Sequence, residues 1–123
     1  MQRFVFKISD RQDWEQAQAA GRYAGSADDA RDGFIHFSSA AQVEGTLEKH
    51  FAGQSDLVLA CIDTSALDED MRWEVSSSGK AYPHLYADLP FSAVVKTLPI
   101  HPEVDGETLM ELASLMAANA EVK

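Results

Sequence analysis

Two short segments of the sequence place a histidine among large apolar side chains. His36 lies in DGFIHFSS (residues 32–39), and His84 lies in YPHLY (residues 82–86). Both segments are typical of β-strands, in which successive side chains point to opposite faces. The side chains predicted to share a face with one of these histidines are Phe34 and Ser38 for His36, and Tyr82 and Tyr86 for His84. Imidazole titrates near neutral pH, so either histidine can serve as a general acid, a general base or a ligand.

A third segment, MRWEV (residues 71–75), supplies a carboxylate for these histidines. Strand alternation places Arg72 and Glu74 on one face and Trp73 on the other. A carboxylate beside an imidazole fixes its tautomer, so we predict that Glu74 and the two histidines form a catalytic group where the strand faces converge. The predicted ligand-binding residues around this group are Ser38, Arg72, Trp73, Tyr82 and Tyr86.

The same residue types could also build a metal site or a serine nucleophile. Two histidines and one glutamate would satisfy the donor number of a metal site, but neither HxxxH nor HxH occurs, so no metal site is predicted. A serine nucleophile would need Ser38 or Ser39 beside a histidine, whereas both serines are better explained as helix caps. The alternative is a purely structural role. His36 would then be half-buried, with its ring hydrogen-bonded to a backbone carbonyl, and Trp73, Tyr82 and Tyr86 would lie in the hydrophobic core or at its rim.

The elements that must position these residues follow from hydrophobic periodicity and capping signals. The predicted strands are residues 3–8, 34–38, 56–63, 71–75, 82–86 and 93–100, with 56–63 apolar enough to be buried on both faces. Ser9 with Gln12, and Ser39 with Gln42, resemble capping boxes that open helices after the first and second strands. Residues 21–33 are expected to form a long loop, and residues 105–120 a C-terminal helix.

Length and composition limit the class of protein. The chain has 123 residues, which suits a single domain, and its composition of 46% hydrophobic and 24% charged residues is that of a globular protein. Its formal charge of -10 would repel phosphate backbones, so nucleic acid is not an expected partner. The sequence lacks the roughly 20 consecutive apolar residues of a membrane-spanning helix, and we expect a cytoplasmic protein. The fold class predicted is α+β, with a mostly antiparallel arrangement of strands.

The segments DGFIHFSSAAQV, RWE and YPHLYADLPFSAVV, in this order, resemble the family of small bacterial and plant proteins catalogued as domain of unknown function 952. The resemblance covers a body of residues 3–100 and leaves the C-terminal helix outside. It implies an ADP-ribosyltransferase-like fold, in which two split sheets grip NAD in a cleft. In that comparison His36 falls at an aromatic position near the nicotinamide, and His84 falls near the strand of the catalytic glutamate.

Two functional hypotheses follow from the residues and the resemblance. In the first, the cleft binds a nucleotide-like small molecule, such as NAD or an ADP-ribose-like ligand, and catalyses ribosyl or phosphoryl transfer. In the second, the same fold is a non-catalytic ligand-binding or protein-interaction domain. Convergence of His36, Glu74 and His84 on one open pocket would favour a ligand site over a purely structural role for these residues.

Overall fold

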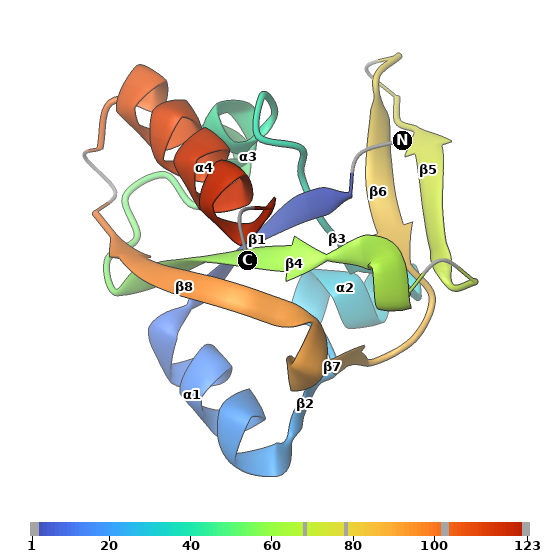
Figure 1. Cartoon of the computed structure of the whole chain (residues 1–123). Helices are drawn as coiled ribbons and strands as arrows, with labels where there is room; N and C mark the ends of the chain where they lie inside the picture. Colours follow the sequence, from blue (N-terminus) through green and yellow to red (C-terminus); the bar gives the residue numbers. More distant parts are fainter. Residues whose placement is uncertain (1–2, 68, 78, 102–103, 122–123) are drawn as a thin grey trace.

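The structure is a computed structural model that describes residues 3–67, 69–77, 79–101 and 104–121. Strands and helices alternate over the first half of the chain, strands follow one another over most of the second half, and a last helix comes after them in an α+β arrangement (Figure 1). The strands are β1 (Phe4–Asp10), β2 (Arg22–Tyr23), β3 (Ile35–His36), β4 (Leu57–Asp63), β5 (Met71–Val75), β6 (Ala81–Leu85), β7 (Leu89–Pro90) and β8 (Val94–Ile100). The helices are α1 (Arg11–Ala20), α2 (Ala27–Asp32), α3 (Val43–His50) and α4 (Gly106–Glu121), with 3-10 turns at Thr64–Ala66 and Phe91–Ala93.

One antiparallel sheet, in the order β1-β4-β8, separates two hydrophobic clusters. Because side chains alternate along a strand, Phe4, Phe6 and Ile8 lie in the cluster covered by α3 and α4. Val5 points to the opposite cluster, which includes Trp14 of α1. The central strand β4 is buried on both faces, as its continuous apolar run predicts. Figure 1 shows α3 and α4 on one side of this sheet and α1 on the other.

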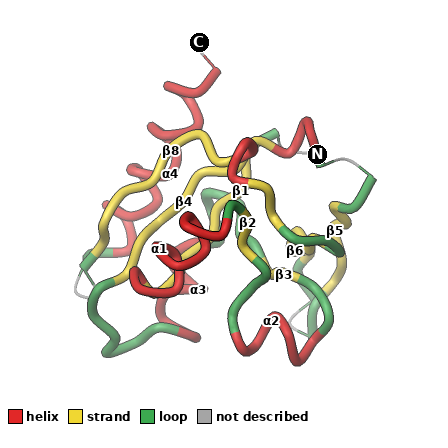
Figure 2. The backbone as a smooth tube through the Cα atoms, turned by 90° about the horizontal axis from the view of Figure 1, so that it is seen from below, coloured by secondary structure: helices red, strands yellow, loops and turns green. Residues whose placement is uncertain are grey.

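A second antiparallel sheet, in the order β3-β6-β5, lies beside the first. The two sheets meet where Phe6 of β1 and Ser38 exchange two backbone hydrogen bonds of 2.7 and 2.8 Å. Figure 2 shows β3, β5 and β6 grouped apart from β1, β4 and β8. The predicted division into mostly antiparallel sheets is therefore confirmed, although the strand expected over residues 34–38 is shorter.

The long loop predicted over residues 21–33 is wrong, because this segment holds β2 and α2. Ser26 opens α2 with a capping box: its hydroxyl accepts the Asp29 N–H, and the Asp29 carboxylate accepts the Ser26 N–H. Gly33 ends the helix with φ of 87°, a left-handed conformation that glycine adopts without a Cβ clash. A helix of six residues is too short to give a clear hydrophobic period, which is why the sequence pattern suggested a loop.

The predicted helix caps are only partly correct. Asp10, and not Ser9, caps α1, since its side chain accepts the backbone N–H groups of Gln12 and Asp13. In the second predicted capping box, Ser39 with Gln42, the Gln42 side chain accepts the Ser39 N–H at 3.0 Å. The helix α3 begins only at Val43, so Ser39 does not cap it. The C-terminal helix is confirmed as α4, which buries Leu109, Ala113 and Met116 against β1 and β4.

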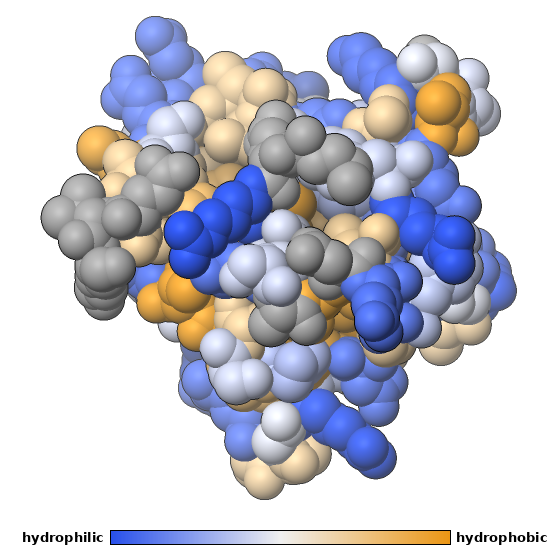
Figure 3. All heavy atoms as spheres, turned by 45° about the vertical axis from the view of Figure 1, so that its right-hand side comes forward, coloured by the Kyte–Doolittle hydropathy of each residue, from blue (hydrophilic) through white to orange (hydrophobic). Residues whose placement is uncertain are grey.

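The surface is mostly polar over the face that Figure 3 displays, where hydrophilic side chains are spread widely and hydrophobic ones form small groups. Among the residues that the structure describes, the large hydrophobic side chains that are exposed are Val75, Tyr86, Val95 and Leu115. They lie in four different parts of the chain, so they do not line up along one strand or helix. No helix within the described part of the chain is long and apolar enough to cross a membrane.

Candidate functional site

A pocket of about 470 Å³ lies where the two sheets, α2 and α3 come together. Its wall from the second sheet includes Phe34, His36, Tyr82 and His84. The charged side chains that line it are Lys7, Asp28, Asp29, Arg31, Asp32 and Lys49. The pocket therefore combines titratable rings, charges of both signs and an aromatic surface, which is the usual character of a ligand site.

His36 is held by a carboxylate that the sequence pattern did not identify. Asp29 Oδ1 lies 2.6 Å from His36 Nδ1 and accepts the His36 backbone N–H at 3.1 Å. The capping box at the start of α2 fixes Asp29 from the other side, and only 2% of its side chain is exposed. A buried carboxylate on Nδ1 sets the orientation of the ring and with it the direction of Nε2.

The negative charge of Asp29 is balanced by Lys7, which β1 delivers from the first sheet. Lys7 Nζ lies 2.9 Å from Asp29 Oδ2 and donates to the His36 carbonyl oxygen at 2.9 Å. Burial lowers the pKa of Lys7, and the Asp29 charge opposes that effect. Burial would raise the pKa of Asp29, but hydrogen bonding from His36 and the Lys7 charge outweigh it and hold that pKa well below its usual range. Asp29 is therefore an ionised buried group.

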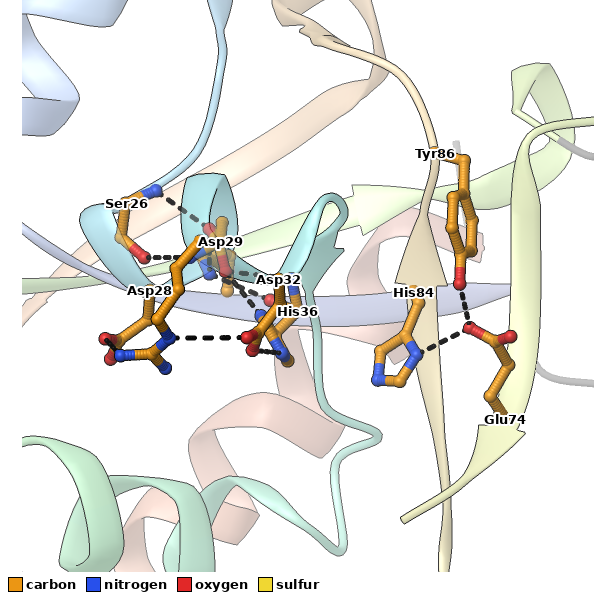
Figure 4. A network of polar contacts seen from close by, with 10 residues as sticks. Ser26, Asp28, Asp29, Asp32, His36, Glu74, His84 and Tyr86 are labelled. Carbon is orange, nitrogen blue, oxygen red and sulfur yellow. Dashed lines mark hydrogen bonds and ion pairs between the residues drawn. The ribbon is translucent and has the colours of Figure 1, made fainter.

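The second nitrogen of His36 also faces a carboxylate. Asp32 Oδ2 lies 3.0 Å from His36 Nε2, one helical turn from Asp29 (Figure 4). Because an ionised carboxylate only accepts hydrogen bonds, both contacts are hydrogen bonds when the ring carries a proton on each nitrogen. Asp32 is 36% exposed, so the two carboxylates differ sharply in their contact with water.

His84 has a carboxylate of its own from the neighbouring strand. Glu74 Oε1 lies 2.8 Å from His84 Nδ1 and accepts the Tyr86 hydroxyl at 2.6 Å. The hydrogen bonds from Tyr86 and then from His84 lower the pKa of Glu74. An ionised Glu74 places the proton of His84 on Nδ1, so the neutral ring keeps its lone pair on Nε2.

The register of β3 and β6 brings the two histidines together. His36 is the direct partner of His84 in this antiparallel pair, and their ring centroids are 5.3 Å apart in an edge-on arrangement. Phe34 stacks on the His84 ring at 4.1 Å and lies 4.7 Å from the His36 ring. Figure 4 shows the two rings on adjacent strands, each with its Nδ1 turned to its own carboxylate. His36 and His84 therefore line one pocket, whereas Glu74 contacts His84 and is not among the residues of the pocket wall.

The predicted ligand-binding residues divide into two groups. Ser38 and Tyr82 line the pocket, with the Ser38 hydroxyl bonded to that of Thr46 at 2.7 Å, so Ser38 is not a helix cap. Tyr86 reaches the site through Glu74 and is not part of the pocket wall. Arg72 is exposed and lies over the Tyr86 ring, with 5.6 Å between its guanidinium carbon and the ring centroid. Trp73 packs against the hydrophobic core, on the face of β5 that alternation assigns to it.

Lys7, Asp29 and Asp32 were missed as site residues, although two local signals point to them. Lys7 is the one charged residue within the apolar run FVFKI, and S-A-D-D at residues 26–29 matches a capping box. Neither signal places these residues beside His36, because Lys7 is 29 positions away in the chain and the position of Asp29 depends on how the short helix α2 packs. His50, near the end of α3, is exposed and lines the pocket.

The chemistry available here is proton transfer by two oriented imidazoles. In the described part of the chain, no group of three or more His, Cys, Asp or Glu side chains is arranged to hold a metal ion. The carboxylates are instead occupied by His36, Lys7, His84 and Tyr86. Two imidazoles in one pocket, with different partners, can act as an acid and a base on one ligand.

Two solved structures similar to this chain are both of protein CC0527 from Caulobacter crescentus. Its X-ray crystal structure has 39% sequence identity and a TM-score of 0.79, and the match covers 86% of this chain and 97% of that chain. Its solution NMR structure has 38% sequence identity and a TM-score of 0.75, and the match covers 93% of this chain and 97% of that chain. A comparison with curated proteins finds no match. Residues 8–97 match the family described as "Protein of unknown function (DUF952)", and the chain belongs to this family.

Proposed function

We propose that the pocket binds a nucleotide-like small molecule and that His36 and His84 carry out acid/base catalysis on it. The observation that carries this proposal is the pair of rings, 5.3 Å apart, each fixed at Nδ1 by its own carboxylate. A purely structural histidine needs only one satisfied contact, whereas two oriented rings on one pocket match the needs of proton transfer.

The two histidines suit different roles. His36, between Asp29 and Asp32, is the candidate acid because both of its nitrogens face carboxylates. His84 is the candidate base because its Nδ1 proton is directed to Glu74 and its Nε2 faces no described partner. An acid and a base side by side on one pocket wall can serve transfer of either a ribosyl or a phosphoryl group.

A nucleotide-like ligand is supported by the pocket walls and by the arrangement of the sheets. Phe34 and Tyr82 offer aromatic faces for a base, and Lys49 offers a cation for a phosphate. Two small sheets beside one cleft agree with an ADP-ribosyltransferase-like fold, which we propose as the ancestry of the site. In ribosyl transfer, Asp29 and Asp32 would supply negative charge near a developing ribosyl cation.

The test is isothermal calorimetry with NAD, ADP-ribose and ADP on the intact protein and on three variants. His36→Ala and His84→Ala should each weaken nucleotide binding at least about tenfold, which corresponds to about 1.4 kcal/mol. His101→Ala is the matched control, because His101 is exposed and lies outside the pocket wall. Absence of heat with all three nucleotides at millimolar concentration would refute the proposal.

Turnover separates the catalytic proposal from a non-catalytic binding domain. Mass spectrometry of the nucleotide after incubation with the protein detects a released nicotinamide or a lost phosphate. Catalysis predicts that His36→Ala and His84→Ala reduce product formation at saturating nucleotide by about 100-fold or more. Tight binding without any product, in the intact protein, would assign the pocket to ligand binding alone.

A further inference from the structure

We propose that His36 Nε2 is an anion-binding point of the pocket, and that the Asp32 carboxylate is an internal anion which a phosphate oxygen replaces. The inference rests on the proposed function, because it takes the pocket as a ligand site. It adds the position of the phosphate and a residue that competes for it. The relevant contact is the 3.0 Å approach of Asp32 Oδ2 to His36 Nε2.

The two carboxylates on His36 are held very differently. Asp29 is 2% exposed and is bound by Lys7, Ser26 and His36, so it cannot move without breaking α2 and the contact to β1. Asp32 is 36% exposed, and its other partner is the exposed side chain of Arg31 at 3.4 Å. Exposed ion pairs of this kind contribute little free energy, about 1 kcal/mol or less. The Asp32 contact is therefore the one that a ligand can replace.

The position of Asp32 favours such a replacement. It is the last residue of α2, directly before the left-handed Gly33, and it lines the pocket beside His36. Asp29 fixes the His36 ring through Nδ1, so Nε2 keeps its direction when Asp32 leaves. A phosphate oxygen accepts a hydrogen bond from imidazolium as a carboxylate oxygen does, and it carries the same sign of charge.

Cations elsewhere on the pocket wall favour phosphate over a neutral ligand group. Lys49 and His50 of α3 line the same pocket, and Lys49 has no ion pair among the described residues. The pocket lining contains three aspartates and three basic residues, which are Lys7, Arg31 and Lys49. When the Asp32 carboxylate turns toward solvent, the local balance shifts toward positive charge. The chain as a whole carries a charge of -10, so this selectivity is a local property of the pocket.

Asp32→Asn and Asp28→Asn form a matched pair for the test. Both remove one negative charge from α2, both residues line the pocket, and both contact Arg31. Asp28 is 58% exposed and makes no described contact with His36, so only Asp32→Asn frees the Nε2 position. The probes are inorganic phosphate and ADP at constant ionic strength, and the readout is the ring signals of His36 and His84 in ¹H–¹⁵N spectra.

We expect Asp32→Asn to tighten phosphate binding at least about fivefold more than Asp28→Asn, with the largest shift at His36 Nε2. Adding His36→Ala to Asp32→Asn should abolish this gain. If the affinity for ADP increases more than the affinity for phosphate, the anion that binds here belongs to a nucleotide. If the two affinities increase equally, the anion is free phosphate. Equal effects of the two asparagine variants, or a gain that survives loss of His36, would overturn the inference.

The result also separates this inference from the proposed function. If NAD or ADP binds the intact protein while the two variants behave alike, the inference fails and the proposed function stands. If phosphate tightens in Asp32→Asn alone and no nucleotide binds any variant, the inference stands and the nucleotide hypothesis fails. Asp32→Ser repeats the test with a smaller side chain, in case the asparagine amide itself bonds His36 Nε2.

Discussion

His36 and His84 face each other across an antiparallel pair of strands, and each directs its Nδ1 atom to a carboxylate. The carboxylate on His36 is Asp29, which is almost fully buried, whereas the one on His84 is Glu74, with 39% of its side chain exposed. The rings therefore have the same register position but different electrostatic surroundings. The two rings therefore meet a ligand in the pocket from different surroundings, although their backbone positions are paired.

The buried pair of Lys7 and Asp29 should be the most sensitive point of the site. Asp29→Asn leaves the buried Lys7 ammonium without its counter-charge, and breaking a buried ion pair typically costs about 3–5 kcal/mol. We expect the free energy of unfolding to fall by about that amount in urea denaturation. Adding Lys7→Met should restore part of the loss, because it removes the uncompensated charge.

The control for this prediction is Asp28→Asn, one position earlier on the same helix. Asp28 is exposed and, within the described part of the chain, its ion pair is with the exposed Arg31, so this change should alter the free energy of unfolding by about 0.5 kcal/mol or less. Similar losses for Asp28→Asn and Asp29→Asn would mean that the buried pair has no special role in stability.

Stability should fall in acid because two aspartates have lowered pKa values. The pKa of Asp29 lies well below its usual range, and the hydrogen bond from Arg3 lowers the pKa of Asp63 to about 2. In the unfolded chain these groups take up protons near pH 4, so below that pH the unfolded state binds more protons. Their contribution is complete above about pH 4 and is lost as the pH falls toward the folded-state pKa values.

The measurement is urea denaturation at several pH values between about 2 and 6. Asp29→Asn should flatten the dependence of unfolding free energy on pH across this range, relative to the intact chain. Asp63→Asn should flatten it less, since Asp63 is nearer the surface and its charge is better screened. A pH dependence unchanged by Asp29→Asn would contradict the assignment of an ionised, stabilising carboxylate.

Tyr86→Phe should raise the pKa of Glu74 by removing the hydrogen bond that lowers it most. The titration of the Glu74 carboxyl carbon can be followed by ¹³C NMR in both proteins. Tyr82→Phe is the control, because Tyr82 is the β6 residue paired with Glu74 but makes no described hydrogen bond to it. Equal shifts in the two variants would show that the Tyr86 hydroxyl does not act on Glu74.

Gly25 should tolerate alanine less well than Gly33, although both have positive φ. A Cβ on Gly25 would lie 2.7 Å from the Asp29 Cβ, whereas a Cβ on Gly33 would meet nothing within 4 Å. The left-handed backbone alone costs alanine about 1–2 kcal/mol. Thermal unfolding should therefore show a modest loss for Gly33→Ala and a clearly larger one for Gly25→Ala. Equal losses would mean that Asp29 can move aside freely.

Local pattern was enough to predict most of the body of the fold. Continuous apolar runs identified β1 and β4, which are buried along nearly their whole length, and patterns of apolar, aromatic and β-branched residues identified β5, β6 and β8, which are more exposed. The same alternation predicted that His36, Glu74 and His84 point toward a common side. The family resemblance on DGFIHFSSAAQV and RWE was also correct, since the matched region spans both segments.

Only the packing of separate elements against one another determines which charged side chains lie beside His36 in the pocket. The short helix α2 has too few residues to show a period, so a loop was expected where Asp29 and Asp32 are placed. Lys7 and Asp29 approach each other only because β1 and α2 flank β3, and burial then makes their pairing favourable. The strand faces that carry the histidines could be read from the chain alone, because alternation is a property of a single strand. The contacts of Asp29 and Asp32 with His36 could not, because they depend on how the short helix α2 packs beside β3.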